Sequence, residues 1–227
     1  MIKGKIKDEL NEFETEIQTL LGNHEERFGY IYYFDLLQET FIRAAKHSIN
    51  DSRKFKNELI NEDPENIPSL MQSYESVLNP LISTLYKSYF ITVHSELEMM
   101  LTELNDIVKK YYDNSNFPKK ANPSFRIFKD EENKSPFIKN TLLEHDVLVT
   151  YNYIRNGMTH SKNDKTCSLY VELEKHIKSG KINFLEIIDN DKGFNYLITE
   201  IDFIINYTEE IISFFQDLID NSIKYRK

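Results

Sequence analysis

The chain has 227 residues and a formal net charge of −9; hydrophobic residues make up 40% of it and charged residues 29%. This composition is typical of a folded globular protein and excludes a disordered chain. The negative charge excludes a high-affinity nucleic-acid binder that relies on global attraction, but a local basic cleft would still permit a brief, salt-dependent contact with RNA.

A reducing compartment is indicated by the single cysteine, Cys167, which excludes an intrachain disulfide and a cysteine-rich zinc site. The N-terminus begins with lysines but is not followed by the apolar core of a signal peptide. No stretch reaches the ~18–20 apolar residues that a membrane-spanning helix needs. We therefore expect a cytoplasmic protein with no membrane segment.

Two helices are predicted in the N-terminal part. Residues 5–22 repeat apolar side chains every three or four positions, which is typical of an amphipathic helix. A second helix is predicted from about residue 25 to 48, and we interpret its aromatic residues as a packing surface rather than a base-stacking platform, because few basic residues lie among them. Residues 49–66 are polar and end in prolines, so a linker is expected there. We accordingly divide the chain into an N-terminal helical extension, 1–62, and a helical domain, 67–227.

The helical domain is predicted to contain three further helical segments. A helical pattern runs from Ser69 to about Tyr112, and Pro80 is expected to divide it. A long loop is expected over 113–140, a helix over 141–161, and a small β-hairpin within 162–194. A long amphipathic helix is predicted from Asn195 to Tyr225. The expected fold is all-α, a bundle of about five or six helices with a small hairpin inserted.

The predicted helix near Val147–Asn163 carries the most informative pattern. On a helical wheel, its apolar residues fall in one sector and Asn152, Asn156 and Thr159 fall on the opposite side. Arg155 and His160 lie at the two edges of this polar stripe, about 140° apart. One helix alone would therefore make a splayed site, and two such helices packed across a twofold axis would bring both pairs into one cleft.

These residue types suit RNA cleavage without a metal or cofactor. A histidine with a pKa near ~6.5 takes a proton from a ribose hydroxyl and gives one to the leaving oxygen. Arginine binds phosphate oxygens and stabilises the charge of the transition state. We expect Asn152, Thr159 and Lys162 to contact the substrate, the amide and hydroxyl groups by hydrogen bonds and the lysine by its charge.

The segment YIRNGMTHSKN, residues 153–163, resembles the signature of the HEPN family, in which an arginine followed by a polar residue precedes a histidine on one helix. The segment Tyr89–Glu98 resembles the neighbouring helix of that fold, and the similarity covers residues 67–225. The resemblance implies a HEPN-like helical bundle and a homodimeric endoribonuclease of toxin–antitoxin, abortive-infection or CRISPR-linked defence, with an antitoxin or another defence protein as a partner. It also implies that Arg155 and His160 form the catalytic pair, supported by Asn156.

Other polar residues have less specific patterns. His94 and Glu98 share a helix face, and the simplest interpretation is a surface ion pair; alternatively, Glu98 or Glu96 supports Arg155 from the neighbouring helix. Two ligands at this spacing do not make a metal site without a third. His145 is expected at the surface or an interface. No Gly-rich phosphate loop is present in the sequence, which makes ATP hydrolysis an unlikely activity.

Three functions remain open at this stage. The first is a metal-independent endoribonuclease that leaves a 2′,3′-cyclic phosphate and a 5′-hydroxyl. The second is a catalytically inactive HEPN-like module that binds a protein partner or a nucleotide. The third is a helical interaction protein in which the Arg155–His160 spacing is accidental.

Overall fold

The computed structural model describes most of the chain. The described residues are 2–22, 28–62, 67–111, 141, 144–160, 168–190 and 193–224. Within these ranges the chain forms six helices and one two-stranded antiparallel hairpin. The expected all-α bundle with a small hairpin is therefore confirmed.

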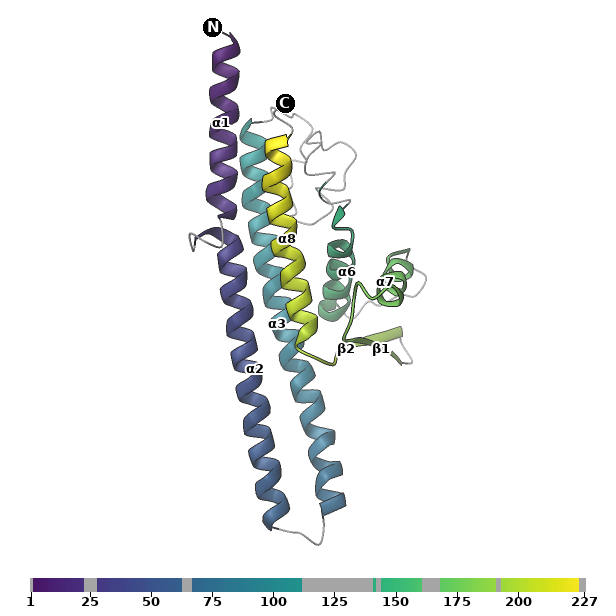
Figure 1. Cartoon of the computed structure of the whole chain (residues 1–227). Helices are drawn as coiled ribbons and strands as arrows, with labels where there is room; N and C mark the ends of the chain where they lie inside the picture. Colours follow the sequence, from purple (N-terminus) through teal and green to yellow (C-terminus); the bar gives the residue numbers. More distant parts are fainter. Residues whose placement is uncertain are drawn as a thin grey trace.

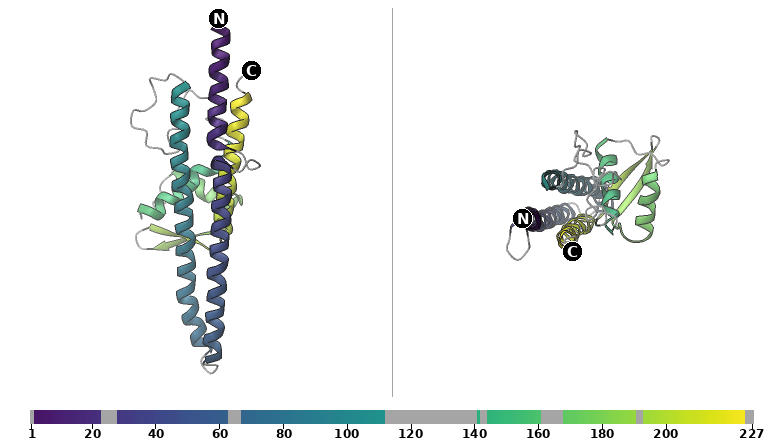
Figure 2. Two further views of the ribbon diagram at one scale, coloured as in Figure 1. Left: turned by 90° about the vertical axis from the view of Figure 1, so that its left-hand side faces the viewer. Right: turned by 90° about the horizontal axis from the view of Figure 1, so that it is seen from above.

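Three long helical rods form the body of the molecule (Figure 1). Helix α1 (Ile2–Leu21) and helix α2 (Gly29–Glu62) follow one another along the first rod. Helix α3 (Ile67–Tyr111) runs back beside them, and helix α8 (Asp202–Lys224) runs in the same direction as α3. Viewed from above, the rods form a triangle (Figure 2). The lower parts of α2 and α3 extend beyond the end of α8 as a two-helix arm.

A smaller group of elements lies to one side of the rods. It contains α6 (Val147–His160), α7 (Ser168–Lys178), β1 (Leu185–Asn190) and β2 (Gly193–Ile198). The two strands pair from Leu185 with Ile198 to Asn190 with Gly193. Helix α6 packs against α3 and α8, and α7 packs against α6 (Figure 2). Strand β2 of the hairpin contacts both α6 and α3.

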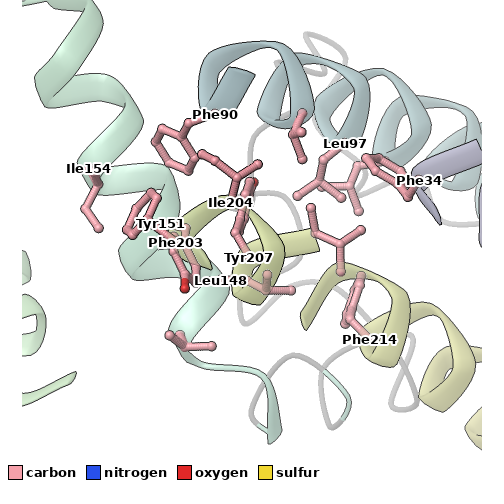
Figure 3. Close-up of a cluster of buried hydrophobic side chains, with 14 of the residues drawn as sticks. Phe34, Phe90, Leu97, Leu148, Tyr151, Ile154, Phe203, Ile204, Tyr207 and Phe214 are labelled. Carbon is pink, nitrogen blue, oxygen red and sulfur yellow. The ribbon is translucent and has the colours of Figure 1, made fainter. Parts of the chain in front are cut away.

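The hydrophobic core lies where α3, α6 and α8 meet (Figure 3). Phe90 and Leu97 of α3 lie here, opposite Tyr151 and Ile154 of α6, and all four side chains are buried. The same cluster extends to α1 and α2. The two N-terminal helices thus share their core with α3 and α8. The proposed division at residue 62 stays a prediction, and residues 63–66 lie outside the described part of the chain.

Two glycines make the junction between α1 and α2. Gly22 and Gly29 both have a positive φ, +69° and +75°, which L side chains rarely adopt. A Cβ atom on Gly22 would lie 1.9 Å from the carbonyl oxygen of Phe28, and one on Gly29 would lie 2.4 Å from the Cα of Gly22. The two backbone segments therefore cross in direct contact, and only glycine fits at either position.

Two expectations for the rods were wrong. The polar segment 49–62 is not a linker but the continuation of α2. It contains no glycine or proline, and the segment packs on α3 through contacts such as the hydrogen bond that Tyr74 Oη donates to the Ser52 carbonyl, 2.6 Å long. Pro80 does not divide α3, which continues through it. Pro80 is exposed, so the chain loses one backbone hydrogen bond there without burying an unsatisfied group.

The lateral group also differs in detail from the prediction. The helix predicted over 141–161 is interrupted by a turn at residues 145–146: residues 141 and 144 are helical, and α6 begins at Val147. Helix α7 was not anticipated, and α8 begins at Asp202 because residues 195–198 belong to strand β2. Alternating burial of Phe194, Tyr196 and Ile198 gives these residues the period of a strand. The loop expected over 113–140 lies outside the described residues.

The described helices were also compared with the requirements of a bilayer. Among them, none is both long enough and apolar enough to cross a membrane.

Candidate functional site

The motif helix α6 has one apolar face and one polar face. Val147, Tyr151, Ile154 and Met158 are buried, as the helical wheel predicted. On the other side, Asn152, Arg155 and Asn156 are half-buried, and Thr159 is exposed. The polar stripe therefore begins at the junction with α3 and ends in solvent.

The side chain of Arg155 is held by two neighbours. Its Nη2 donates a hydrogen bond to Oε2 of Glu98 on α3, 3.0 Å away, and its Nη1 donates to Oδ1 of Asn156, 2.9 Å away. The predicted pairing of Arg155 with Glu98 is confirmed by this contact. Arg155 Nε is buried and has no acceptor among the described residues. The guanidinium is thus fixed in place and retains N–H groups that the described protein atoms do not use.

A chain of hydrogen bonds continues from this arginine into the core. Asn156 Nδ2 donates to Oδ1 of Asn152 over 3.3 Å. The same Oδ1 lies 3.2 Å from Nε2 of His94 on α3, and Nδ1 of His94 lies 2.6 Å from the hydroxyl of Tyr207 on α8. We call Arg155, Asn156, Asn152, His94 and Tyr207 the Arg155 network. It joins three helices and runs from the polar face of α6 to the centre of the core.

His94 is not part of a surface ion pair, and that interpretation was wrong. Its side chain is fully buried, and Nε2 lies 3.8 Å from Oε1 of Glu98, too far for a hydrogen bond. Burial, together with the nearby charge of Arg155, lowers the pKa of His94 to about 3. His94 is therefore neutral near pH 7.

Glu98 occupies an environment with opposing effects. Burial raises the pKa of its carboxyl group, and the Arg155 guanidinium partly offsets this increase by favouring the ionised form. The carboxylate and guanidinium side chains are 23% and 20% exposed, so the pair lies at the edge of the core rather than in open solvent.

The remaining predicted site residues are placed only in part. The Thr159 hydroxyl donates to the backbone carbonyl of Arg155, 3.0 Å away, and the residue is exposed. His160 is the last residue of α6, and its side chain lies outside the described atoms. Lys162 and Cys167 also lie outside the described residues. The structure therefore brings together Asn152, Arg155, Asn156 and Glu98, and it leaves the position of the other predicted residues untested.

A second histidine cluster lies just before α6. His145 is 6% exposed, which corrects the expectation of a surface residue. Its Nδ1 lies 2.7 Å from Oε1 of Glu210, and its Nε2 lies 2.8 Å from Oδ2 of Asp217, both on α8. Burial by itself lowers the pKa of His145, but the hydrogen bonds and charges of the two carboxylates outweigh it, so the pKa is raised.

A polar cleft of about 280 Å³ opens on the other edge of α6 from Arg155. Lys87 of α3, Gly157 of α6 and Asn195 of β2 lie on its three sides. Within the described part of the chain, Lys87 has no carboxylate partner, so its ammonium group is available to a ligand. The walls also include Ser83, Thr84, Met158 and Tyr196.

Sequence reasoning missed Tyr207 and assigned His94 to the wrong environment. Tyr207 lies among apolar residues of an amphipathic helix, where a tyrosine usually reads as core packing. A possible signal was the spacing on α3: His94 follows Phe90 by four residues and precedes Leu97 and Leu101, which places it on the apolar face. A histidine in such a position needs buried hydrogen-bond partners.

Comparisons with known proteins were made by family model, by sequence and by structure. No family model, no curated protein and no solved structure matches this chain.

Proposed function

We propose that this protein is a metal-independent endoribonuclease that acts as a homodimer in the cytoplasm, as a toxin or an antiviral-defence effector. The observation that supports the proposal best is the state of Arg155. Its guanidinium is anchored by Glu98 and Asn156, lies at the edge of the core and has a buried Nε without an acceptor among the described residues. A phosphate oxygen would bind at the exposed part of this side chain, which is 20% exposed, because the buried Nε is not reached from solvent.

The proposed reaction uses two residues of α6. His160 takes the proton of a ribose 2′-hydroxyl, whose oxygen attacks the adjacent phosphorus, and a histidine in its protonated form gives a proton to the leaving 5′-oxygen. Arg155 stabilises the additional negative charge on the phosphate oxygens. The products are a 2′,3′-cyclic phosphate and a 5′-hydroxyl, and DNA, which lacks the 2′-hydroxyl, is not cleaved.

A homodimer would complete the site. The polar face of α6 ends at the exposed Thr159, beside the histidine that closes the helix. Two such faces packed across a twofold axis would place two arginines and two histidines along one groove. We propose an antitoxin or another protein of a defence system as the partner that restrains the dimer.

The test is RNA cleavage in the presence of EDTA. The wild-type protein is expected to cleave mixed RNA, and Arg155→Ala and His160→Ala are each expected to reduce the rate by about 10²–10⁴-fold. Matched controls are Arg43→Ala and His47→Ala, which remove exposed residues of the same types from α2. Both controls should cleave at the wild-type rate, and mass spectrometry of the products should find cyclic phosphate ends.

Three outcomes would contradict the proposal. Equal activity in Arg155→Ala and wild type would indicate a contaminating nuclease. Cleavage that is lost in EDTA would indicate a metal-dependent site. A strict monomer by analytical ultracentrifugation that still cleaves would exclude the composite site.

A second candidate function is the binding of a nucleotide without cleavage. The polar cleft beside α6 favours it, because the ammonium group of Lys87, the Ser83 hydroxyl and the Asn195 amide suit a phosphate and its ester oxygens. The test is the binding of ATP, GTP and AMP by calorimetry, with Lys87→Ala as the variant that should lose binding. Lys175→Ala, which removes an exposed lysine of α7, serves as the control.

A further inference from the structure

We propose that Tyr207 and His94 are positioning residues, which fix the orientation of the Arg155 guanidinium from the core through Asn152 and Asn156. The inference concerns how Arg155 is held. Its catalytic consequence rests on the proposed function, but the orientation itself does not.

The orientation of each group in the Arg155 network follows from the arginine. A guanidinium has only donors, so Asn156 must turn its oxygen toward Arg155 and its Nδ2 toward Asn152. Asn152 must therefore present its oxygen to Asn156. The same oxygen faces Nε2 of His94, so that nitrogen carries the proton and donates.

The other end of the network is fixed by the hydroxyl of Tyr207. Because His94 is neutral and donates through Nε2, its Nδ1 is an acceptor, and the Tyr207 hydroxyl donates to it over 2.6 Å. Burial keeps Tyr207 protonated by raising its pKa, so the donor is retained at physiological pH. The hydrogen bonds on both sides thus lead toward Asn152. Tyr207 donates to His94 and His94 to Asn152 on one side, and Arg155 donates to Asn156 and Asn156 to Asn152 on the other.

Asn152 is the residue where the two sides meet, since its one oxygen accepts from both His94 and Asn156. If His94 changed tautomer, Nε2 would become an acceptor. The side-chain amide of Asn152 would then flip, so that its Nδ2 donates a hydrogen bond to Nε2. Its nitrogen would then face the nitrogen of Asn156, and Asn156 could keep its bond to Asn152 only by turning away from Arg155. The hydroxyl of Tyr207 opposes this rearrangement, because its proton needs an acceptor in the core and Nδ1 of His94 provides one.

Because the network lies in the core, its loss would change the orientation of Arg155 rather than remove a contact with the substrate. Tyr207 and His94 are completely buried, and they contact neither solvent nor a substrate. Tyr207 of α8 lies next to Tyr151 of α6, with their ring centroids 4.4 Å apart (Figure 3). A small displacement of a catalytic arginine lowers the reaction rate steeply, because transition-state stabilisation depends on preorganised donors.

The experiment compares Tyr207→Phe with Tyr86→Phe. Both substitutions remove one hydroxyl from a buried tyrosine and keep the ring, and only Tyr207 belongs to the network. The first readout is the nitrogen-edited NMR signal of the Arg155 Nε–H, assigned by its loss in Arg155→Lys. We expect its exchange with solvent to be faster by about tenfold or more in Tyr207→Phe, and unchanged in Tyr86→Phe.

The second readout is RNA cleavage by the same variants. Tyr207→Phe is expected to lower kcat by about 10–100-fold with little change in KM, whereas Tyr86→Phe should keep the wild-type kcat. Thermal stability should fall more in Tyr207→Phe, which leaves the buried Nδ1 of His94 without its donor, than in Tyr86→Phe. A merely structural role of Tyr207 would change stability alone.

A conservative rescue at His94 provides an independent test. The side chain of glutamine offers one acceptor and one donor at a spacing similar to that of the imidazole nitrogens, and leucine offers neither. His94→Gln is therefore expected to keep more of the protection of the Arg155 Nε–H than His94→Leu.

The outcomes separate this inference from the proposed function. An Arg155 signal that is equally protected in wild type and Tyr207→Phe overturns the positioning role, whatever the nuclease assay gives. A signal that changes as expected, in a wild-type protein that cleaves no RNA, supports the positioning role and overturns only the nuclease.

Discussion

Two buried histidines lie beside helix α6, and their pKa values are shifted in opposite directions. His94, next to the middle of α6, has neutral hydrogen-bond partners, and burial and the nearby charge of Arg155 lower its pKa to about 3. His145, just before α6, lies between the carboxylates of Glu210 and Asp217, and its pKa is raised. Both side chains are nearly inaccessible to solvent. Burial acts to lower the pKa of both histidines, and only His145 has carboxylate partners whose hydrogen bonds and charges outweigh it.

The two clusters therefore attach α6 to the rods in different ways. The His94 cluster depends on directed hydrogen bonds between neutral groups, which are sensitive to orientation. The His145 cluster depends on charge, which is sensitive to pH and tolerates small movements. The following predictions test this contrast, from the largest expected effect to the smallest.

The largest effect is expected for His94 on acidification. Because its pKa is lower in the folded protein than in the unfolded chain, the unfolded chain binds the additional proton, so stability falls as pH decreases below about 6.5. By pH 5 the loss from this residue should be about 2 kcal/mol. Urea denaturation at pH 7 and pH 5 measures it, with His94→Gln as the variant that lacks the titrating group. An equal loss on acidification in both proteins would contradict the assignment of a neutral His94.

An intermediate effect is expected for His145. His145→Leu leaves Glu210 and Asp217 without their shared partner, and the free energy of unfolding at pH 6 should fall by about 1–2 kcal/mol, because both carboxylates are partly exposed. The pKa of His145 is raised on folding, so this contribution is present below pH ~6.5 and is lost as pH rises through the folded pKa. The difference from wild type should therefore be smaller at pH 9 than at pH 6.

The control for His145 is His47→Ala. His47 pairs with Asp51 on the exposed face of α2, and its side chain is 80% exposed. The stability of this variant should equal that of wild type at both pH values. If the difference in unfolding free energy between wild type and His145→Leu is the same at pH 6 and pH 9, it comes from packing rather than charge.

The smallest effect is expected for the ion pair between Lys181 and Asp146, which lies next to the buried His176. Burial acts to raise the pKa of Asp146, but the hydrogen bond and charge of Lys181, with a contribution from His176, outweigh it and lower the pKa. The lysine and aspartate side chains are 51% and 44% exposed, so solvent screens the pair, and Lys181→Ala should cost less than about 1 kcal/mol. The cost should disappear at low pH as Asp146 is protonated, which a carboxyl NMR titration can follow. A loss as large as that of His145→Leu would remove the distinction between exposed and buried clusters.

The sequence contained enough information for the helices but not for all of their ends. Apolar spacing identified α1, α3, α6 and α8, because each buries one continuous face. It stopped the second helix at residue 48, since residues 49–62 bury little and their polar side chains resemble a linker. It also assigned residues 195–198 to the final helix, although these four residues belong to strand β2. Element boundaries depend on tertiary pairing, which local periodicity does not encode.

The sequence also predicted part of the candidate site, but not all of its residues. Arg155, Asn152 and Asn156 were identified by their type and spacing, and the pairing with Glu98 followed from expecting α3 beside α6. Tyr207 was not accessible in this way, because it comes from a helix more than fifty residues later in the chain and its role depends on a hydrogen bond to a side chain on a third helix. The direction of a hydrogen-bond network is a property of the assembled core and has no signature in one segment.

The glycine pair at the junction of α1 and α2 limits how this protein can vary in sequence. The two backbones touch at Gly22 and Gly29, so even an alanine at either position would force the chain apart at the point where the first rod changes helix. The N-terminal helix contributes Phe13, Ile17 and Leu21 to the shared core, and a shift of its axis would withdraw them together. Two positions far from any proposed chemistry are thus among the least replaceable in the molecule, while long surface stretches of α2 and α3 remain free to change.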